Sequence, residues 1–314
     1  MAAIKMNRIT LPISKSIANR ILLLQAIHRD ELMPVSVNMP DDVHVLHDAL
    51  ARLREDKKGE PLTLNLKNCG TALRFLQVHL ERCYPGEPIT LTGDPRLMER
   101  IGAPTTQTTS ALIMHGIEPS AVSNQQSDES PYITMTRRIA QAYPNIQLER
   151  DWSSAAFWYE YAAIHGGELL LEGLTDKSLQ GDRIVADIYA EHFGVQTTFI
   201  AEGALIVKDT NRRLNVNCQL SFINYPDLYP AIALTCERLG ITLHATGTNR
   251  LAYKESNRLE AVATHETRHD HRMAMALLVA GFPVDDTDCI TKSYPTFLQQ
   301  WIALTSAAER AGVG

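Results

Sequence analysis

The sequence repeats one kind of phrase, and its fullest version is TLHATGTNRLAYKESNR at residues 242–258. A strand-like run is followed by a glycine, then by a polar loop, and then by a basic residue where helical periodicity begins. Related phrases are TLTGDPRLMER at 90–100 and LLLEGLTDKSLQGDR at 169–183. We interpret them as a weak internal repeat of one supersecondary unit, which predicts an α/β or α+β fold.

Short strand-like runs alternate with amphipathic helical stretches along the chain. Strands are predicted at 62–66, 89–92, 169–171, 205–207 and 241–244. Six helical stretches begin with polar or charged residues, as in HDHRMAMALLVAGF at 269–282. One such start is only a helix cap, worth about 1 kcal/mol.

The six helix starts together carry an unusual set of polar and basic side chains: Lys15, Ser16, Arg20, Lys254, Arg258, His271 and Arg272. Unsatisfied N–H groups and the helix dipole make such N-termini suitable for anions. Lysine and arginine add stronger, charge-assisted hydrogen bonds. The pattern therefore predicts a cleft for one or two ligands that carry several negative charges.

Length and charge limit the class of protein. A chain of 314 residues exceeds what one hydrophobic core usually holds, so two domains are expected. The formal net charge of −6 argues against a nucleic-acid binder, and the chain has neither a G-x-x-x-x-G-K-[ST] loop nor a G-x-G-x-x-G turn for nucleotides. The N-terminus has no signal-like apolar segment, and no apolar run approaches about 18 residues, so no membrane association and a cytoplasmic location are expected.

The cysteines suggest neither a disulfide framework nor a zinc site. The five residues are odd in number and form no C-x-x-C pair, so we expect reduced thiols. Histidines 269 and 271 could be considered as metal ligands, but residues at i and i+2 do not share a helix face. No metal and no cofactor are therefore expected.

A set of collinear blocks resembles the 5-enolpyruvylshikimate-3-phosphate (EPSP) synthase family and spans almost the whole chain. The blocks are LPISKSIANR (11–20), NCGTALRF (68–75), LTGDPRLMER (91–100), TTQTTSALIM (105–114), SPYITMT (130–136), DWSSAAF (151–157), SLQGD (178–182), NYPDLYP (224–230), YKESNRL (253–259), HDHRMAMA (269–276) and KSYPTF (292–297). Each block alone is a weak signal, but their common order is not expected by chance.

The resemblance implies a reaction and a fold. The reaction is transfer of the enolpyruvyl group of phosphoenolpyruvate (PEP) to the 5-hydroxyl of shikimate 3-phosphate with release of phosphate, a step of the shikimate pathway toward chorismate and the aromatic amino acids. The fold is the enolpyruvyl transferase type, a two-domain inside-out α/β barrel of repeated βαβαββ units. Mapped onto this sequence, 14–150 forms the domain on the shikimate-phosphate side, and 1–13 with 151–314 forms the domain with the catalytic carboxylates. The family is usually monomeric and acts on these two small molecules.

The resemblance also implies roles for individual residues. Lys15, Asp227 and Glu255 are implied to be catalytic: Asp227 as the base at the 5-hydroxyl, and Glu255, with Lys15, as the proton shuttle at the methylene carbon. The shikimate 3-phosphate side is implied to consist of Lys15, Ser16, Arg20, Thr105, Thr106, Gln107, Tyr132, Asp227 and Lys254. The PEP side is implied to consist of Lys15, Gly70, Arg100, Gln107, Arg258, Arg272 and Lys292.

Simpler interpretations of these residues stay open from sequence alone. Asp227, after Pro226, has the pattern of a helix N-cap. Glu255, between Lys254 and Arg258, has the pattern of a solvated, charged helix face. Gly70 has the pattern of an ordinary glycine at a helix start.

The chain also departs from the family pattern. It is shorter, and segments are missing around 101–104, between Arg138 and Asp151, and between Glu266 and His269. Glu129 stands where the family has a serine and would repel a substrate phosphate. The alternative function is therefore a catalytically impaired variant that only binds anions or only folds. A sister transferase acting on UDP-N-acetylglucosamine is the weaker alternative, because it lacks the KES-x-R and DHRMAMA blocks.

Overall fold

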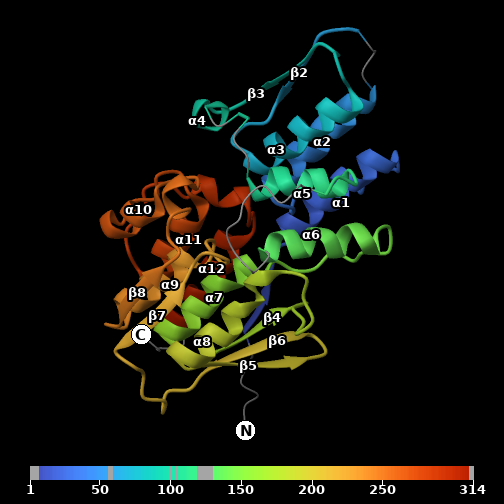
Figure 1. Cartoon of the computed structure of the whole chain (residues 1–314). Coiled ribbons are helices and arrows are strands. Elements are labelled where there is room, and N and C mark those ends of the chain that lie inside the picture. Colours follow the sequence, from blue (N-terminus) through green and yellow to red (C-terminus); the bar gives the residue numbers. More distant parts are fainter. Residues whose placement is uncertain (1–6, 56–58, 100, 103–104, 119–129, 311–314) are drawn as a thin grey trace. The chain divides into compact units, whose positions relative to one another are not determined.

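The structure is a computed structural model that describes residues 7–55, 59–99, 101–102, 105–118 and 130–310. The chain divides into two compact units. Unit 1 consists of Met1–Pro12 and Glu149–Gly314, and unit 2 consists of Ile13–Leu148. Unit 2, coloured from blue to green in Figure 1, is thus inserted in the sequence of unit 1.

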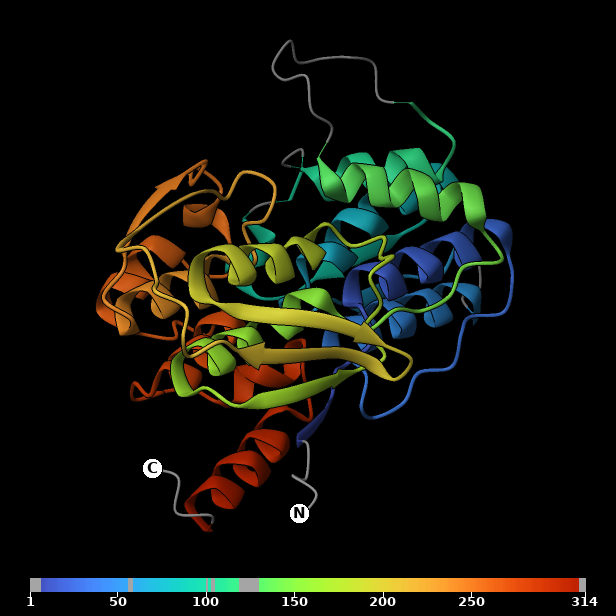
Figure 2. The same ribbon diagram turned by 90° about the horizontal axis from the view of Figure 1, so that it is seen from below.

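Unit 1 contains a mixed sheet with the strand order β1-β4-β6-β5. The strands are β1 (Asn7–Thr10), β4 (Glu168–Glu172), β5 (Val195–Ile200) and β6 (Gly203–Lys208). β1 pairs with β4 in parallel, whereas β6 is antiparallel to both of its neighbours. Helices α7 (Trp152–His165) and α8 (Val185–Phe193) pack against this sheet, as Figure 2 shows.

The rest of unit 1 surrounds a second, parallel pair of strands, β7 (Asn217–Ser221) and β8 (Thr242–Thr246). The helices here are α9 (Tyr229–Arg238), α10 (Arg258–Thr264), α11 (His271–Ala280) and α12 (Phe297–Arg310), with the short 3-10 helices η1 (Gly181–Ile184), η2 (Leu251–Tyr253) and η3 (Asp288–Lys292). Helices α7, α9 and α11 pack on one another, and Trp158, Ile232 and Met275 on them are fully buried. Helices that are apolar on every side belong in a core, which explains the alanine, methionine and leucine run after His271.

Unit 2 is mainly helical. Its elements are α1 (Lys15–His28), α2 (Asp41–Glu55), β2 (Leu62–Asn65), α3 (Gly70–Cys83), β3 (Ile89–Thr92), α4 (Pro95–Met98), α5 (Thr106–Met114) and α6 (Pro131–Ala142). Strands β2 and β3 pair in parallel. Leu23, Leu46, Phe75 and Ile139, from four different helices, lie in its buried interior.

Two of the three phrases of the predicted repeat, at 90–100 and 242–258, begin in the last strands of two similar strand–helix–strand units, β2-α3-β3 and β7-α9-β8. The third, at 169–183, begins in β4, which pairs in parallel with β1. In each of the two strand–helix–strand units, the residue after the first strand donates a backbone hydrogen bond to the last residue of the second: Leu66 N to Thr92 O at 2.7 Å, and Phe222 N to Thr246 O at 2.9 Å.

Steric crowding explains why the repeated phrase contains a glycine. A Cβ atom at Gly93 would lie 2.5 Å from Lys67 O, and one at Gly247 would lie 2.7 Å from Ile223 N. At both positions the chain that follows the partner strand lies against the glycine, so a larger residue would push the two segments apart.

The predicted strands are confirmed, with small differences in their ends. β3 has the predicted bounds, and β2 ends one residue earlier. Strands β1, β5 and β7 have no counterpart among the predicted runs, because at least half of their residues are polar, as in NRIT and NCQLS. The helix expected to open at Asn68 begins at Gly70, and Cys69 Sγ accepts its capping hydrogen bond from Ala72 N.

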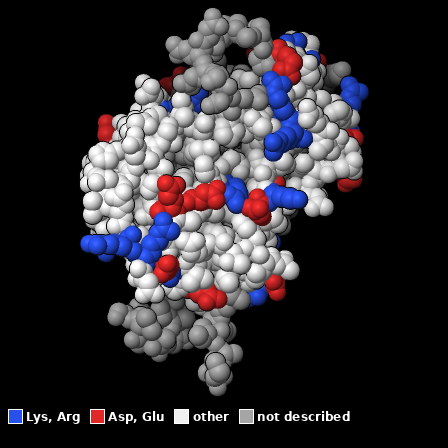
Figure 3. Space-filling view, turned by 60° about the horizontal axis from the view of Figure 1, so that its bottom comes forward, with Lys and Arg blue, Asp and Glu red and all other residues white. Residues whose placement is uncertain are grey.

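The charged surface and the helices can be compared with what nucleic-acid binding or a membrane span would require. Figure 3 shows one face on which basic and acidic side chains are interspersed, without a broad field of either sign among the described residues. In the described part of the chain, no helix combines the length and apolarity needed to cross a membrane.

Candidate active site

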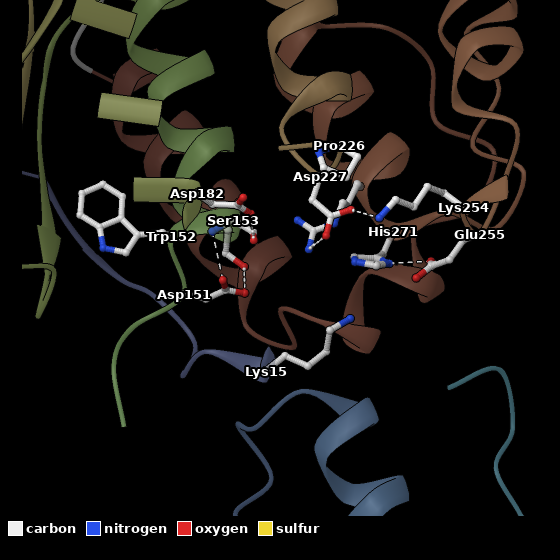
Figure 4. A network of polar contacts seen from close by, with 12 residues as sticks. Lys15, Asp151, Trp152, Ser153, Asp182, Pro226, Asp227, Lys254, Glu255 and His271 are labelled. Atoms are coloured by element: carbon white, nitrogen blue, oxygen red, sulfur yellow. Dashed lines mark hydrogen bonds and ion pairs between the residues drawn. The ribbon is translucent and has the colours of Figure 1, made fainter. Parts of the chain in front are cut away.

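Unit 1 gathers charged side chains where loops follow its parallel strands and where its helices begin. Asp227 follows β7, and Lys254 and Glu255 follow β8. Arg258 is the first residue of α10, and Arg272 lies in the first turn of α11. Figure 4 shows Asp227, Lys254, Glu255 and His271 turned toward one another. Open α/β sheets commonly bind ligands at such carboxyl ends of strands.

Asp227 lies among three cations. Its Oδ1 is 2.8 Å from Arg258 Nη1 and 3.2 Å from Lys254 Nζ, and its Oδ2 is 3.4 Å from Arg272 Nη2. Burial alone raises the pKa of Asp227, but the charges of Arg272, Lys254 and Arg258 together bring it well below the usual range. The side chain is therefore a carboxylate at neutral pH. It is not the helix cap considered above, because the N-cap of α9 is Leu228.

Arg258 is a buried cation between two carboxylates. Its Nε is 2.8 Å from Asp270 Oδ2, while its Nη1 also donates to the carbonyl of Pro226. Asp270 is fully buried and caps α11 by accepting a hydrogen bond from Arg272 N at 3.0 Å. Burial raises the pKa of Asp270, but the charges of Arg258 and His271 and the hydrogen bond from Arg258 together lower it below its usual value. The HDHR segment thus supplies a helix cap and a counterion.

Glu255 belongs to a second ion pair in the same cluster. Its Oε2 is 2.7 Å from His271 Nδ1, and its Oε1 is 3.0 Å from Lys292 Nζ. His271 and Lys292 are buried, whereas the Glu255 side chain is 25% exposed. Glu255 precedes α10 and lies outside any helix, so a solvated helix face does not describe it. A carboxylate with one imidazole and one ammonium at its oxygens can exchange protons with a ligand at its exposed side.

Arg272 combines burial with unused hydrogen-bonding capacity. The residue is 4% exposed, and its Nη1 has no hydrogen-bond partner within the residues that the structure describes. An unsatisfied buried guanidinium nitrogen is costly for the protein alone and is a strong donor for an anion.

Asp182 is a cluster residue that the sequence analysis did not assign. It is buried on η1 after β4 and accepts a hydrogen bond from Ser153 Oγ. Burial and the nearby charge of Asp227 raise its pKa to about 6, although Arg272 opposes the shift. The SLQGD block was the signal that could have identified it, because the block continues one of the repeated phrases.

Unit 2 has an ion pair between the starts of α1 and α2, and polar residues at the starts of α5 and α6. Lys15 Nζ is 2.9 Å from Asp42 Oδ2, and Asp42 lies buried in the first turn of α2. Sequence reasoning missed Asp42, because the DDVH segment that carries it belongs to none of the recognised blocks.

Arg20 is buried among neutral oxygen atoms. It donates from Nε to Thr136 Oγ1 at 2.7 Å, from Nη1 to Ser16 O at 2.8 Å and from Nη2 to Ser110 Oγ at 3.2 Å. Burial lowers its pKa to about 10. In the described ranges no carboxylate forms an ion pair with it, so its charge is not compensated locally.

The other predicted residues of unit 2 also lie at helix starts. Thr105 caps α5 by accepting from Thr108 N at 3.3 Å, and Gln107 Nε2 donates to Thr71 Oγ1 at 3.4 Å. Thr106 is the first residue of α5, and Tyr132 lies in the first turn of α6. At Gly70 a Cβ atom would be 3.5 Å from Arg74 Nη1, so the protein itself does not require this glycine. Arg100 and Glu129 lie outside the described residues.

These features define an α/β protein of repeated strand–helix units with charged and polar side chains at its helix N-termini, an arrangement that suits the binding of anions. The sequence matches the family "EPSP synthase (3-phosphoshikimate 1-carboxyvinyltransferase)" over residues 109–268 and 262–301. This chain belongs to the EPSP synthase family.

Curated relatives agree with this assignment. The chain is 26% identical to a 3-phosphoshikimate 1-carboxyvinyltransferase of Bacteroides fragilis over 411 aligned positions, which cover 98% of this chain and 96% of the relative. It is 29% identical to the enzyme of the same name from Methanopyrus kandleri, over 74% of this chain and 66% of that one. Because 411 positions exceed 314 residues, the chain is shorter than the first relative and aligns with gaps.

A solved structure shows the fold. The EPSP synthase from Acinetobacter baumannii superposes with a TM-score of 0.61 and 18% sequence identity, covering 98% of this chain and 96% of that one. The chain therefore has the enolpyruvyl transferase fold, as the resemblance implied.

Proposed function

We propose that the chain is a 3-phosphoshikimate 1-carboxyvinyltransferase of aromatic amino acid biosynthesis. It transfers the enolpyruvyl group of PEP to the 5-hydroxyl of shikimate 3-phosphate and releases phosphate. The observation that carries the proposal is Asp227, held as a carboxylate beside Arg272, whose Nη1 has no hydrogen-bond partner among the described residues. A base next to an unsatisfied cation suits a reaction between a hydroxyl group and an anion.

The reaction needs a base, an acid and several cations. The 5-hydroxyl oxygen bonds to the central carbon of PEP, the hydroxyl proton leaves to the base, and the methylene carbon takes up a proton. The carbon–oxygen bond to phosphate then breaks, and the new methyl group loses a proton to restore the double bond. We assign the base to Asp227 and the proton transfers at carbon to Glu255 with Lys15. The cations stabilise the charge that moves onto phosphate.

The low pKa of Asp227 fits a base that is activated only when ligand is present. Arg272 and Lys254 lower this pKa while they face the carboxylate. A phosphate or carboxylate group of a ligand competes for the same cations, which weakens their effect on Asp227. The pKa of Asp227 then rises toward the range in which a carboxylate takes up a proton efficiently.

The remaining assignments combine the contacts with the family resemblance. Arg272 binds PEP directly, whereas Arg258 positions Asp227 and completes the PEP-side charge together with Lys292. Arg20, which lacks a local carboxylate in the described part of unit 2, supplies positive charge for shikimate 3-phosphate. The complete proposal retains Ser16, Thr105, Thr106, Gln107, Tyr132 and Lys254 for shikimate 3-phosphate, and Gly70 and Arg100 for PEP.

A phosphate-release assay tests the proposal. The protein mixed with shikimate 3-phosphate and PEP should release phosphate, and omission of shikimate 3-phosphate should abolish the release. Asp227→Asn should slow release by about 10²–10⁴-fold, while titration calorimetry still detects binding of shikimate 3-phosphate. Absence of release from the parent protein contradicts the proposal. Release with UDP-N-acetylglucosamine in place of shikimate 3-phosphate supports the sister transferase.

The second candidate function is a catalytically impaired protein, and the backbone next to an expected missing segment supports it. Arg268 and His269, next to an expected missing segment, both have left-handed backbone conformations with φ of 50° and 58°. Non-glycine residues adopt this conformation at a cost of about 1–2 kcal/mol each. An impaired protein that binds ligands is the alternative, and calorimetric binding of shikimate 3-phosphate without turnover by the parent protein would support it.

A further inference from the structure

Unit 2 brings together two histidines and a cysteine that the proposed reaction does not use. His79 and Cys83 lie four residues apart on α3, so they share one face of the helix. His115 is the C-cap residue of α5, which packs against α3. The candidate ligand atoms of the three residues lie within 4.8 Å of one another.

We propose that His79, Cys83 and His115 form a binding site for Zn²⁺, with an open fourth position for water. In tetrahedral zinc sites the metal lies about 2.0–2.1 Å from nitrogen, which places two ligating nitrogens about 3.3 Å apart. His79 Nδ1 and His115 Nε2 form a hydrogen bond at 3.3 Å, and a zinc ion that replaces the shared proton would leave this separation unchanged. The two imidazoles are thus already spaced as a zinc ion requires.

The thiol completes the site through a small movement. Tetrahedral zinc places sulfur about 3.6 Å from each nitrogen, and the ligand atoms lie within 4.8 Å of one another, so Sγ has to approach the imidazoles by at most about 1.2 Å. Cys83 is the last residue of α3 and is exposed, so rotation about its Cα–Cβ bond meets little resistance. His79 is only 2% exposed and gives the site a rigid inner wall, while Cys83 gives the ion a path from solvent.

The surrounding charges select for a metal that binds through nitrogen and sulfur. The C-terminal ends of α3 and α5 carry partial negative charge, which favours a cation. Arg54 acts electrostatically on His79, Arg82 on His115 and Arg29 on Cys83, and these charges oppose a cation held by charge alone. Zn²⁺ gains strong bonds to imidazole and thiolate, whereas Mg²⁺ and Ca²⁺ prefer oxygen.

The other group of ligand-type residues in the described structure is Glu255, Asp270 and His271. Its members already form ion pairs and hydrogen bonds with Lys292, Arg258 and each other. This group contains no thiol, so spectroscopy separates the two sites.

Titration with Co²⁺, which replaces Zn²⁺ in tetrahedral sites, tests the proposal on the full chain. We expect one equivalent of Co²⁺ to produce a thiolate-to-metal charge-transfer band, which Zn²⁺ abolishes and excess Mg²⁺ does not. Cys83→Ser should remove the band, and His115→Ala should weaken Co²⁺ binding at least about tenfold, the loss that even an outer residue of a metal site causes. Cys289→Ser is the matched control, because this partly exposed thiol lies in unit 1.

A second measurement does not depend on cobalt. In the Cys289→Ser background, Cys83 is the exposed thiol among the remaining four, since Cys69, Cys218 and Cys236 are buried. Zn²⁺ should slow its reaction with a thiol reagent at least about tenfold, and His115→Ala should restore the rate. Absence of the cobalt band in the parent protein, its persistence in Cys83→Ser, or an unchanged thiol rate with Zn²⁺ would each overturn the proposal.

Discussion

Arg258 and Arg272 lie in the same cluster but differ in what they contact. Arg258 directs its guanidinium to Asp270, Asp227 and a backbone carbonyl. Arg272 contacts Asp227 through one nitrogen and keeps another without a hydrogen-bond partner in the described residues. The first arrangement satisfies the protein itself, whereas the second leaves capacity for a ligand.

Substitution of each arginine by glutamine should separate these roles. Arg258→Gln leaves the fully buried Asp270 without its counterion, so the free energy of unfolding should fall by about 3–5 kcal/mol. Arg272→Gln should cost less stability, because Asp227 retains two cations, but it should raise the KM for PEP at least tenfold. Urea denaturation and steady-state kinetics measure the two effects. Equal losses of stability in both variants would contradict the distinction.

Asp227→Asn tests the proposed base. The amide keeps the size of the side chain but cannot take up a proton, so kcat should fall by about 10²–10⁴-fold. The KM for PEP should change less, because Arg272 and Lys292 stay in place. Phosphate release measures kcat, and circular dichroism checks the fold. A kcat within a few-fold of the parent would exclude Asp227 as the base.

Asp182 should make stability depend on pH. Its folded pKa is raised to about 6, while its ordinary value is 3.8, so the folded state binds more protons between these two values. The contribution of Asp182 to stability is therefore lost as pH rises from about 4 to about 6, by up to about 3 kcal/mol. Asp182→Asn still accepts a hydrogen bond from Ser153 but does not ionise.

The comparison is made at pH 4 and pH 8 by urea denaturation. Relative to the parent, Asp182→Asn should be more stable at pH 8 than at pH 4. A difference between the two proteins that does not change with pH would show that folding leaves the pKa of Asp182 unchanged.

At the scale of elements, two glycines with the same backbone conformation separate the cost of a steric contact from the cost of a left-handed backbone. Gly247 has φ of 64°, and a Cβ there would meet Ile223 N at 2.7 Å. Gly240 has φ of 66°, but a Cβ there would have nothing within 4 Å. The two positions therefore share the backbone cost and differ in the contact.

Substitution of each glycine by alanine should show how much the steric contact at Gly247 costs. Gly240→Ala should lower the free energy of unfolding by about 1–2 kcal/mol, the cost of a left-handed residue. Gly247→Ala should cost at least about 1 kcal/mol more, because the loop after β7 has to move away from β8. Thermal and urea unfolding of the two variants provide the measurement. Equal losses would mean that the loop yields without cost.

Local signals predicted much of the fold and of the cluster. The repeated phrase placed β3 and β8 and the glycines that follow them, and polar helix starts located Lys15, Arg258 and Arg272. The buried carboxyl groups of Asp42 and Asp182 were not predicted, because their partners Lys15 and Ser153 lie 27 and 29 residues away and the contacts depend on how the helices pack. Strands β5 and β7 were missed for a related reason: at least half of their residues are polar, and pairing with a neighbouring strand stabilises them.

At the scale of the molecule, unit 1 is built from two separate stretches of sequence. β1 pairs with β4, and Leu11 and Ile9 join a hydrophobic core that otherwise consists of residues after 151. Tyr294 Oη also donates a hydrogen bond to Thr10 O at 3.0 Å. The first strand therefore contributes to the stability of a unit whose remaining sequence begins more than a hundred residues later.

A substitution of a core residue next to the first strand should therefore destabilise unit 1. Leu11→Ala removes a side chain that is 1% exposed, so the free energy of unfolding of unit 1 should fall by about 2–5 kcal/mol. Arg8→Ala, in β1 just before Leu11, removes only an exposed ion pair with Glu172 and should cost less than about 1 kcal/mol. Native-state hydrogen exchange reports the effect for each element. In Leu11→Ala the amides of α7 and β4 should exchange faster, while those of α3 should keep their rates, because α3 belongs to the unit that Leu11 does not support. An equal acceleration in α3 would show that the two units unfold as one.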